Sequence, residues 1–304
     1  MKTALNLSSE KSTSTSLLAE FKELTKMRLA LSVVFSTIAG YFLAIPDVGS
    51  IDVYTILALA IGGYCMVGAS NAFNQIIERD LDAKMTRTMN RPIPSGRVKP
   101  NAAFVLACTL TIAGIAILYI VNPKTAMFGA ISIFLYTSVY TPLKTITPLS
   151  VFVGAFPGAI PFMLGWVAAT NDFGIEAGTL FIIQFFWQFP HFWAIGWFLY
   201  DDYKKGGFSM LPTGQKDTKT ATQIILYTIW LIIASVFPVF GVTGRLYLTP
   251  VSAVLVLLAG LWMLWAGIKL YKKRTDKAAR SLMLVSVTYI SLIQIIYILD
   301  KILR

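Results

Sequence analysis

The sequence predicts an all-α fold, a polytopic membrane bundle of nine transmembrane helices with its N-terminus in the cytoplasm. Hydrophobic residue types make up 56% of the 304 residues, and the mean hydropathy is +0.67. Charged types make up only 13%, against about 25% in an average soluble domain. A chain this poor in charge cannot cover a globule of its size with polar surface. The composition therefore excludes a soluble enzyme, a disordered protein and a fibrous repeat.

Nine apolar runs have the length that a spanning helix needs, which is roughly 20 residues. They lie at about 29–45, 54–73, 102–121, 126–143, 148–168, 178–200, 221–242, 248–271 and 281–299. Residues 1–27 form a polar cytoplasmic tail with an amphipathic piece near Leu17–Met27. The tail carries acids and lacks the basic-then-apolar order of a cleaved signal peptide. Residues 28–304 are predicted to form a single transmembrane domain.

The basic residues predict the orientation of these helices. If nine spans alternate, 22 of the 26 Lys and Arg residues fall on one side of the membrane and 4 on the other. Because basic loops stay in the cytoplasm, the N-terminus is predicted inside and the C-terminus outside. The net charge of +11 then reflects loops facing an anionic leaflet, and nucleic acid is not an expected partner.

Cysteine and histidine are too scarce for a metal site built from them. Cys65 and Cys108 both lie in apolar runs, where they are typical of small core residues. His191 is the only histidine, so a multi-histidine metal site is excluded.

The first acidic group follows the second apolar run. If that helix continues past Phe73, Asn74, Glu78 and Asp82 stand at i, i+4 and i+8 on one face. Oxygen ligands at a helix end beside the membrane surface suit Mg²⁺, which prefers a few carboxylates together with phosphate oxygens. The alternative is a solvated helix end whose acids pair with Arg79 and Arg87.

Arginines follow these acids in a loop made rigid by prolines. The loop holds Arg87, Arg91 and Arg97, and guanidinium forks match phosphate oxygens. Carboxylates for a metal beside arginines for phosphates are typical of a diphosphate site. The alternative for the arginines is the basic bias of cytoplasmic loops, which explains their sign but not the acids beside them.

Two further groups lie on the same side of the membrane. Asp201, Asp202 and Tyr203 end the sixth apolar run, and Tyr140 and Lys144 lie between the fourth and fifth runs. Three loops on one side thus carry metal-binding, phosphate-binding and charge-neutralising groups, which predicts one common site.

These residues resemble the UbiA superfamily of intramembrane prenyltransferases. Asn74, Glu78 and Asp82 match its first aspartate-rich motif, Tyr140 and Lys144 its Tyr-x-x-x-Lys motif, and Asp201-Asp202-Tyr203 its second acidic motif. Residues 190–193 (Pro-His-Phe-Trp) and 210–212 (Met-Leu-Pro) resemble the branch that farnesylates haem. The resemblance runs from about the first span to the last.

The resemblance implies a magnesium-dependent enzyme of the bacterial inner membrane. It would transfer farnesyl from farnesyl diphosphate to the 2-vinyl group of haem B, with addition of water, to give haem O for terminal oxidases. The implied partners are these two substrates, the lipid bilayer, and the next enzyme of haem A synthesis or a terminal oxidase. Two alternatives stay open: another acceptor such as a quinone precursor, and a cation-coupled transporter. Acids gathered at one surface argue against a transporter, whose ionisable groups usually lie near mid-membrane.

The resemblance assigns roles to particular residues. The predicted metal ligands are Glu78, Asp82 and Asp202, and the predicted catalytic residues are Asn74, Glu78, Asp82, Lys144 and Asp202. The predicted substrate-binding residues are Asn71, Arg87, Arg91, Arg97, Tyr140, His191, Asp201 and Tyr203.

Two departures from the family pattern matter. Glu78 stands where the family usually has Asp. Leu199 and Tyr200 stand where this branch usually has a basic pair, so one phosphate or propionate contact is either missing here or supplied by Lys204 or Lys205.

His191 lies ten residues before Asp201, about 15 Å deeper in the membrane at ~1.5 Å per residue. That depth suits haem better than diphosphate; a purely structural role beside Pro190 is the alternative.

Overall fold

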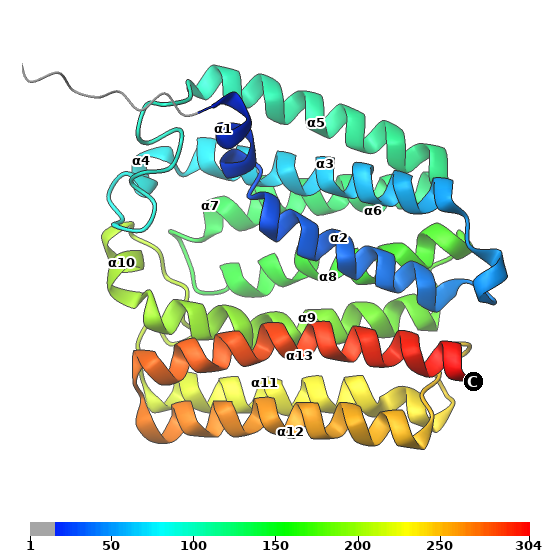
Figure 1. Ribbon diagram of the computed structural model, residues 1–304. Coiled ribbons are helices and arrows are strands. Elements are labelled where there is room, and N and C mark those ends of the chain that lie inside the picture. Colours follow the sequence, from blue (N-terminus) through cyan, green and yellow to red (C-terminus); the bar gives the residue numbers. More distant parts are fainter. Residues whose placement is uncertain (1–15) are drawn as a thin grey trace, which may run out of the picture.

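The computed structural model describes residues 16–304, and the regular structure in that range is helical throughout (Figure 1). The predicted tail at 1–15 lies outside the described residues, while its amphipathic piece forms a short helix. The elements are α1 (Leu17–Leu24), α2 (Met27–Ala44), η1 (Val48–Ser50), α3 (Val53–Ile77), α4 (Arg79–Asp82), α5 (Pro100–Val121), α6 (Pro123–Phe134), η2 (Leu135–Tyr140), α7 (Thr141–Leu143), α8 (Ser150–Thr170), α9 (Ile175–Phe198), α10 (Tyr200–Lys205), α11 (Thr218–Val236), η3 (Phe237–Phe240), α12 (Pro250–Lys273) and α13 (Asp276–Leu303).

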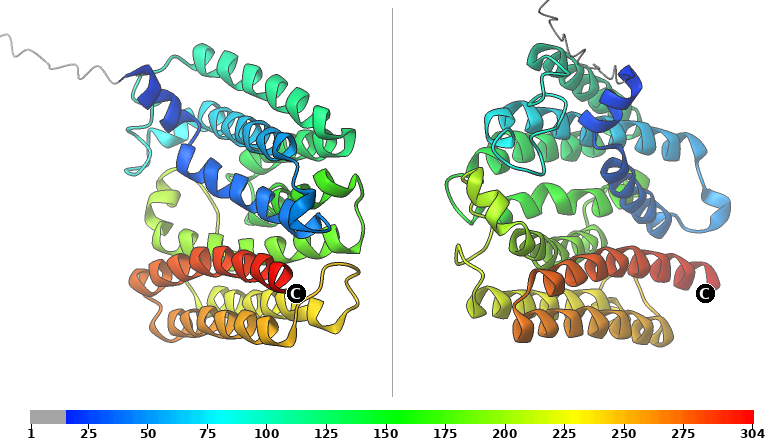
Figure 2. Two further views of the ribbon diagram at one scale, coloured as in Figure 1. Left: turned by 45° about the vertical axis from the view of Figure 1, so that its right-hand side comes forward. Right: turned by 60° about the vertical axis from the view of Figure 1, so that its left-hand side comes forward.

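The long helices run side by side along one common direction (Figures 1 and 2). Within residues 16–304, eight helical stretches are long and apolar enough to cross a membrane. The helix α9, with 24 residues, is also long enough to cross a membrane, but Gln184, Gln188 and His191 make it more polar than these eight stretches. The all-α membrane bundle is therefore confirmed, whereas the ninth span and the orientation stay predictions.

Capping residues set where several helices begin. The Asp52 carboxylate accepts hydrogen bonds from the backbone N–H groups of Tyr54 and Thr55 at the start of α3. The side chain of Asn122 caps α6 in the same way. Such caps satisfy backbone donors that have no partner inside the helix, which matters most where water is scarce.

The fourth predicted span is not a uniform α-helix. It consists of α6, the π-helical turn η2 and the short α7, and the Thr141 hydroxyl donates to the Tyr136 carbonyl at 2.8 Å. A π-turn inserts one residue into the helical ladder and is frequent at functional sites. This turn ends at Tyr140, one of the predicted site residues.

Glycines allow α2 and α8 to pack backbone against backbone. A Cβ on Gly40 would collide with the carbonyl of Phe162, and a Cβ on Gly165 would collide with the carbonyl of Thr37. Small residues at such a contact allow close approach, which drives helix association in lipid. This contact fixes α2 against α8.

Buried apolar side chains form two large clusters. One draws mainly on α8, α9, α11, α12 and α13, and the other mainly on α2, α3, α5 and α6. The helices α2 and α8 contribute to both clusters. The short elements α1, α4, α7 and α10 gather at one end of the bundle (Figure 1), which we call the α4–α10 end.

Topology can be tested with reporters at the two chain ends. If all nine long helices span, a reporter fused before residue 16 lies in the cytoplasm and one fused after Arg304 lies outside. The reason is the 22-to-4 division of basic residues across the membrane. A paired phosphatase and fluorescent-protein fusion at each end measures this directly. Both ends reporting the same side would contradict nine spans.

Candidate functional site

The first acidic group lies at the α4–α10 end, where α3 passes into α4. Glu78 is the C-cap residue at which α3 ends. The Asp82 N–H donates to the Glu78 carbonyl at 2.7 Å, so the backbone continues as a helical turn into α4. Asn74, Glu78 and Asp82 are all buried, with exposed fractions of 4% or less. The Asn74 amide donates to the Thr141 hydroxyl at 3.3 Å, which joins α3 to α7.

Glu78 and Lys144 form a buried ion pair, with 2.7 Å between Oε1 and Nζ. The ammonium also lies 4.6 Å from the ring centre of Tyr140 and 5.7 Å from that of Phe208. Burial acts to lower the pKa of Lys144, but the Glu78 carboxylate outweighs it, and the pKa is raised above its usual value. The structure thus brings the Tyr140–Lys144 motif to the first acidic group, as the sequence predicted.

Asp82 is fully buried, and its two oxygens differ. Oδ2 accepts a hydrogen bond from Arg91 at 2.6 Å, whereas Oδ1 has no hydrogen-bond partner among residues 16–304. Burial raises the pKa of the Asp82 carboxyl, Glu78 adds to the rise, and Arg91 opposes it. A buried carboxylate oxygen without a donor is unusual and fits a cation ligand.

Asp202 of α10 holds the loop that follows α4. Its carboxylate accepts the backbone N–H groups of Thr86 at 2.8 Å and Arg87 at 3.1 Å. Burial would raise the pKa of Asp202, but these two donors outweigh it and keep the pKa below its usual value. In the described part of the chain, no three His, Cys, Asp or Glu side chains lie close enough to hold a metal ion, so Glu78, Asp82 and Asp202 do not form a ready cluster.

The three predicted arginines have different partners. Arg91 binds Asp82, and the Arg87 guanidinium lies 5.9 Å from the ring centre of Tyr203. Arg97 instead binds Glu20 and Glu23 of α1, both at 2.8 Å, and so fastens α1 over the loop.

Three other predicted residues lie apart from the buried carboxylates. Asn71 donates to the Thr25 carbonyl at 3.2 Å and anchors the α1–α2 junction. The Asp201 side chain is 85% exposed and lies 3.8 Å from Lys216. His191 lies within α9 and contacts α13, with 2.8 Å between Nδ1 and the Ser286 hydroxyl oxygen.

A residue that the sequence did not single out, Lys26, joins the site. It precedes α2 with a φ of +47°, in the left-handed region, and is partly buried. Burial and the charges of Arg91 and Lys144 lower the pKa of Lys26 to about 7. A lysine before the first apolar run fits ordinary topology, so nothing in the sequence pattern marks it. Strained backbone at such a position is typical of functional sites.

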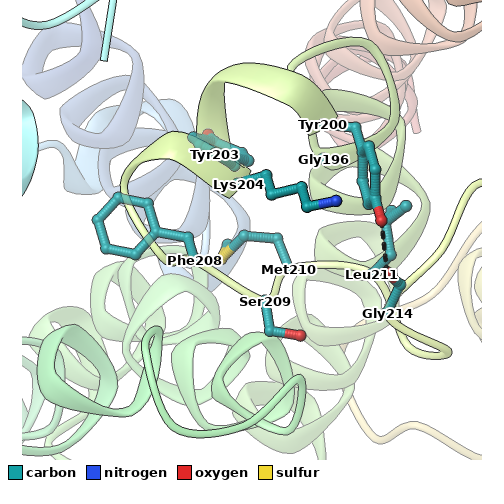
Figure 3. Close-up of a pocket in the computed structure, with 9 residues that line it drawn as sticks. All are labelled: Gly196, Tyr200, Tyr203, Lys204, Phe208, Ser209, Met210, Leu211 and Gly214. Atoms are coloured by element: carbon teal, nitrogen blue, oxygen red, sulfur yellow. Dashed lines mark hydrogen bonds between the residues drawn. The ribbon is translucent and has the colours of Figure 1, made fainter. Parts of the chain in front are cut away.

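A small pocket adjoins the site beneath α10 (Figure 3). It is lined by Tyr200, Tyr203, Lys204 and the 208–211 segment, and the Tyr200 hydroxyl donates to the Gly214 carbonyl at 3.1 Å. Lys205 is engaged by Thr86 and Asp202, whereas the Lys204 ammonium runs into the pocket between the two tyrosines. Of the two lysines considered for the missing anion contact, Lys204 is the one that lines a pocket.

Comparison with known proteins adds a family to this geometry. Residues 33–293 match the model of the UbiA prenyltransferase family. A relative from Flavobacterium psychrophilum, named protoheme IX farnesyltransferase, is 73% identical over 95% of this chain and 96% of its own length. A relative of the same name from Cytophaga hutchinsonii is 43% identical over 93% and 98%, respectively.

Solved structures with the same fold are more distant in sequence. A digeranylgeranylglyceryl phosphate synthase structure superposes with a TM-score of 0.77 at 18% identity, covering 94% of this chain and 99% of its own. A UbiA homologue from Archaeoglobus fulgidus, bound to DMAPP and Mg²⁺, superposes with a TM-score of 0.68 at 13% identity, covering 93% and 99%. These likenesses bear on the fold, and the family match bears on the chain itself. The chain belongs to the UbiA prenyltransferase family.

Proposed function

We propose that this protein transfers the farnesyl group of farnesyl diphosphate to the 2-vinyl group of haem B, with addition of water, to give haem O. The relative named protoheme IX farnesyltransferase, 73% identical over nearly the whole chain, supports the acceptor and the prenyl donor. The site supports the chemistry: two buried carboxylates, Glu78 and Asp82, lie among several cations at one end of the bundle. We place the enzyme in the bacterial inner membrane, where a terminal oxidase or the next enzyme of haem A synthesis would receive its product.

Glu78 and Asp82 fit Mg²⁺, because Asp82 Oδ1 is a buried carboxylate oxygen with no donor among the described residues. Bound there, Mg²⁺ would neutralise charge on the diphosphate leaving group. Asp202 remains the proposed third ligand, since each carboxylate oxygen can accept more than one contact. Its two backbone donors would then hold it in place beside the loop.

Cationic side chains of the protein would balance the rest of the negative charge on the diphosphate. When the C–O bond of the allylic diphosphate breaks, the electron pair leaves with the diphosphate. Lys144, Arg91 and Lys26 would stabilise that developing charge, and a preorganised contact of this kind is worth about 10²–10³ in rate. Asn74, held by Thr141, would orient a phosphate oxygen.

The allylic cation must then be kept from water until the vinyl carbon attacks. The Tyr140 ring packs against that of Tyr136, with 5.2 Å between centres, and both Tyr140 and Phe208 lie beside Lys144. These rings would form an apolar wall next to the departing diphosphate. After C–C bond formation, water would add to the new cation on the haem side chain and release a proton.

Purified protein should form haem O from haem B, farnesyl diphosphate and Mg²⁺. Mass analysis of the extracted haem would show one added farnesyl group and one added hydroxyl group, and chelation of Mg²⁺ should stop the reaction. If a quinone precursor is prenylated while haem B is not, the haem assignment is wrong. If no acceptor is prenylated and the protein moves cations across vesicles, the enzyme assignment is wrong.

Asp82→Asn and Glu78→Gln should each lower the rate by about 10²–10³ with insertion and folding preserved. Both changes keep the size of the side chain and remove the charge proposed to hold Mg²⁺. Glu78→Asp should be mild, because it keeps the carboxylate. The matched control is Asp80→Asn, since the Asp80 side chain is 84% exposed and pairs with Arg79 at the surface. Near-normal haem O formation by Asp82→Asn would exclude a ligand role for Asp82.

Diphosphate affinity should depend on the charge of Lys26. With a pKa lowered to about 7, this ammonium is present below pH 7 and is lost as the pH rises. Lys26→Arg keeps its charge at all these values. As the pH rises from 6 to 8, the affinity of the wild type for inorganic diphosphate should therefore fall by up to about tenfold more than that of Lys26→Arg. This factor corresponds to ~1.4 kcal/mol of binding free energy. Calorimetric titration of both proteins across this range would measure the ratio; a constant ratio would place Lys26 outside the diphosphate site.

A further inference from the structure

The imidazole of His191 is held rigidly between α9 and α13. It stacks on Trp187, one helical turn earlier in α9, with 4.6 Å between ring centres and 18° between planes. The Trp187 indole N–H donates to the Ser286 carbonyl at 2.7 Å, and Nδ1 of His191 lies 2.8 Å from the Ser286 hydroxyl oxygen. One residue of α13, Ser286, therefore fixes both rings of the stack.

The hydrogen bonds of Ser286 select the tautomer of His191. The Ser286 hydroxyl lies 2.7 Å from the Met283 carbonyl, which can only accept, so the hydroxyl proton points there. The hydroxyl oxygen is then free to accept, and Nδ1 of His191 must be the donor. Both contacts are satisfied only if the proton is on Nδ1, which leaves a lone pair on Nε2.

Nothing in the described chain uses that lone pair. Nδ1 is the one ring nitrogen of His191 with a hydrogen-bond partner among residues 16–304, and the side chain is partly exposed. Gln184 lies on the same face of α9, seven residues earlier, and its side-chain oxygen is buried without a partner in the same range. Unpaired polar groups within a membrane helix are costly and indicate a ligand or a pathway.

We propose that Nε2 of His191 is an axial ligand for the iron of the haem acceptor, and that Ser286 is the positioning residue that presents it. This inference rests on the proposed function, which supplies the haem. The lone pair of Nε2 forms a coordinate bond to iron with no change of oxidation state. Because the proton is already on Nδ1, ligation releases none.

The depth of His191 suits this role. It lies seven residues before the end of α9 at Phe198, or about 10 Å at ~1.5 Å per residue. The buried carboxylates and Lys144 lie at the α4–α10 end itself. Iron held by His191 would thus lie deeper than the diphosphate, and the edge of the macrocycle would extend from it toward the prenyl group.

The test compares haem with iron-free protoporphyrin IX as probes of the full-length protein. Wild type should bind ferric haem with the absorption and paramagnetic resonance spectra of imidazole ligation, and should bind haem more tightly than protoporphyrin. His191→Ala should lose these spectra and the preference for iron, and added imidazole should restore the spectra. Its Mg²⁺-dependent binding of farnesyl diphosphate should be unchanged, which shows that the variant is folded.

Variants at Ser286 separate positioning from packing. Ser286→Ala should weaken haem affinity about 10- to 100-fold, as loss of an outer partner of a metal ligand does, without altering protoporphyrin affinity. Ser286→Thr should restore it. The matched control is Ser291→Ala on α13, whose hydroxyl bonds only the Val287 carbonyl among the described residues.

Two results would overturn the inference: wild-type haem spectra in His191→Ala, or equal affinity of the wild type for haem and protoporphyrin. Failure of the proposed function looks different, because the wild type would then ligate haem through His191 and yet make no haem O.

Discussion

The ion pair between Glu78 and Lys144 holds the candidate site together. Its two charges are nearly inaccessible to water, and they come from segments 66 residues apart in sequence. Such a pair is costly to bury. Loss of either partner would leave the other charge buried without a counter-charge, which destabilises the fold by several kcal/mol. Tyr140 and Phe208 both contact Lys144, and Asn74 contacts Thr141 in the segment that leads to it.

The pair also occupies a carboxylate that the proposed metal site needs. In the described arrangement the carboxylates proposed for Mg²⁺ bind cations of the protein, Lys144 and Arg91. An incoming diphosphate would offer those cations a stronger anionic partner and so release the carboxylates for the metal. Metal and diphosphate are then expected to bind together, each completing the other's charge balance.

Much of the architecture could be predicted from the sequence, because the bilayer dictates helix length and the apolar runs are long. Asn74, Glu78, Tyr140 and Lys144 were also predictable as one group, since helical spacing and loop topology bring them to the same end. The partner of each individual charged side chain could not be predicted from the sequence. Arg97 looks like a phosphate ligand in its loop, but its fork is taken by Glu20 and Glu23 of a helix more than 70 residues earlier. Lys26 was not predicted as a site residue, because a lysine just before the first apolar run is already explained by membrane topology.

The π-helical turn η2 sets the rotational phase of everything that follows it. An α-helix turns 100° per residue, whereas the wider π-turn fits one more residue into about the same rotation. If Leu135–Tyr140 took α-helical geometry without losing a residue, the chain beyond would face a different direction. Tyr140 and Lys144 would then swing by roughly a quarter turn away from Glu78. The direction in which Tyr140 and Lys144 point is thus set by the extra residue held in η2, so a substitution that straightens this turn would misdirect both side chains without touching either of them.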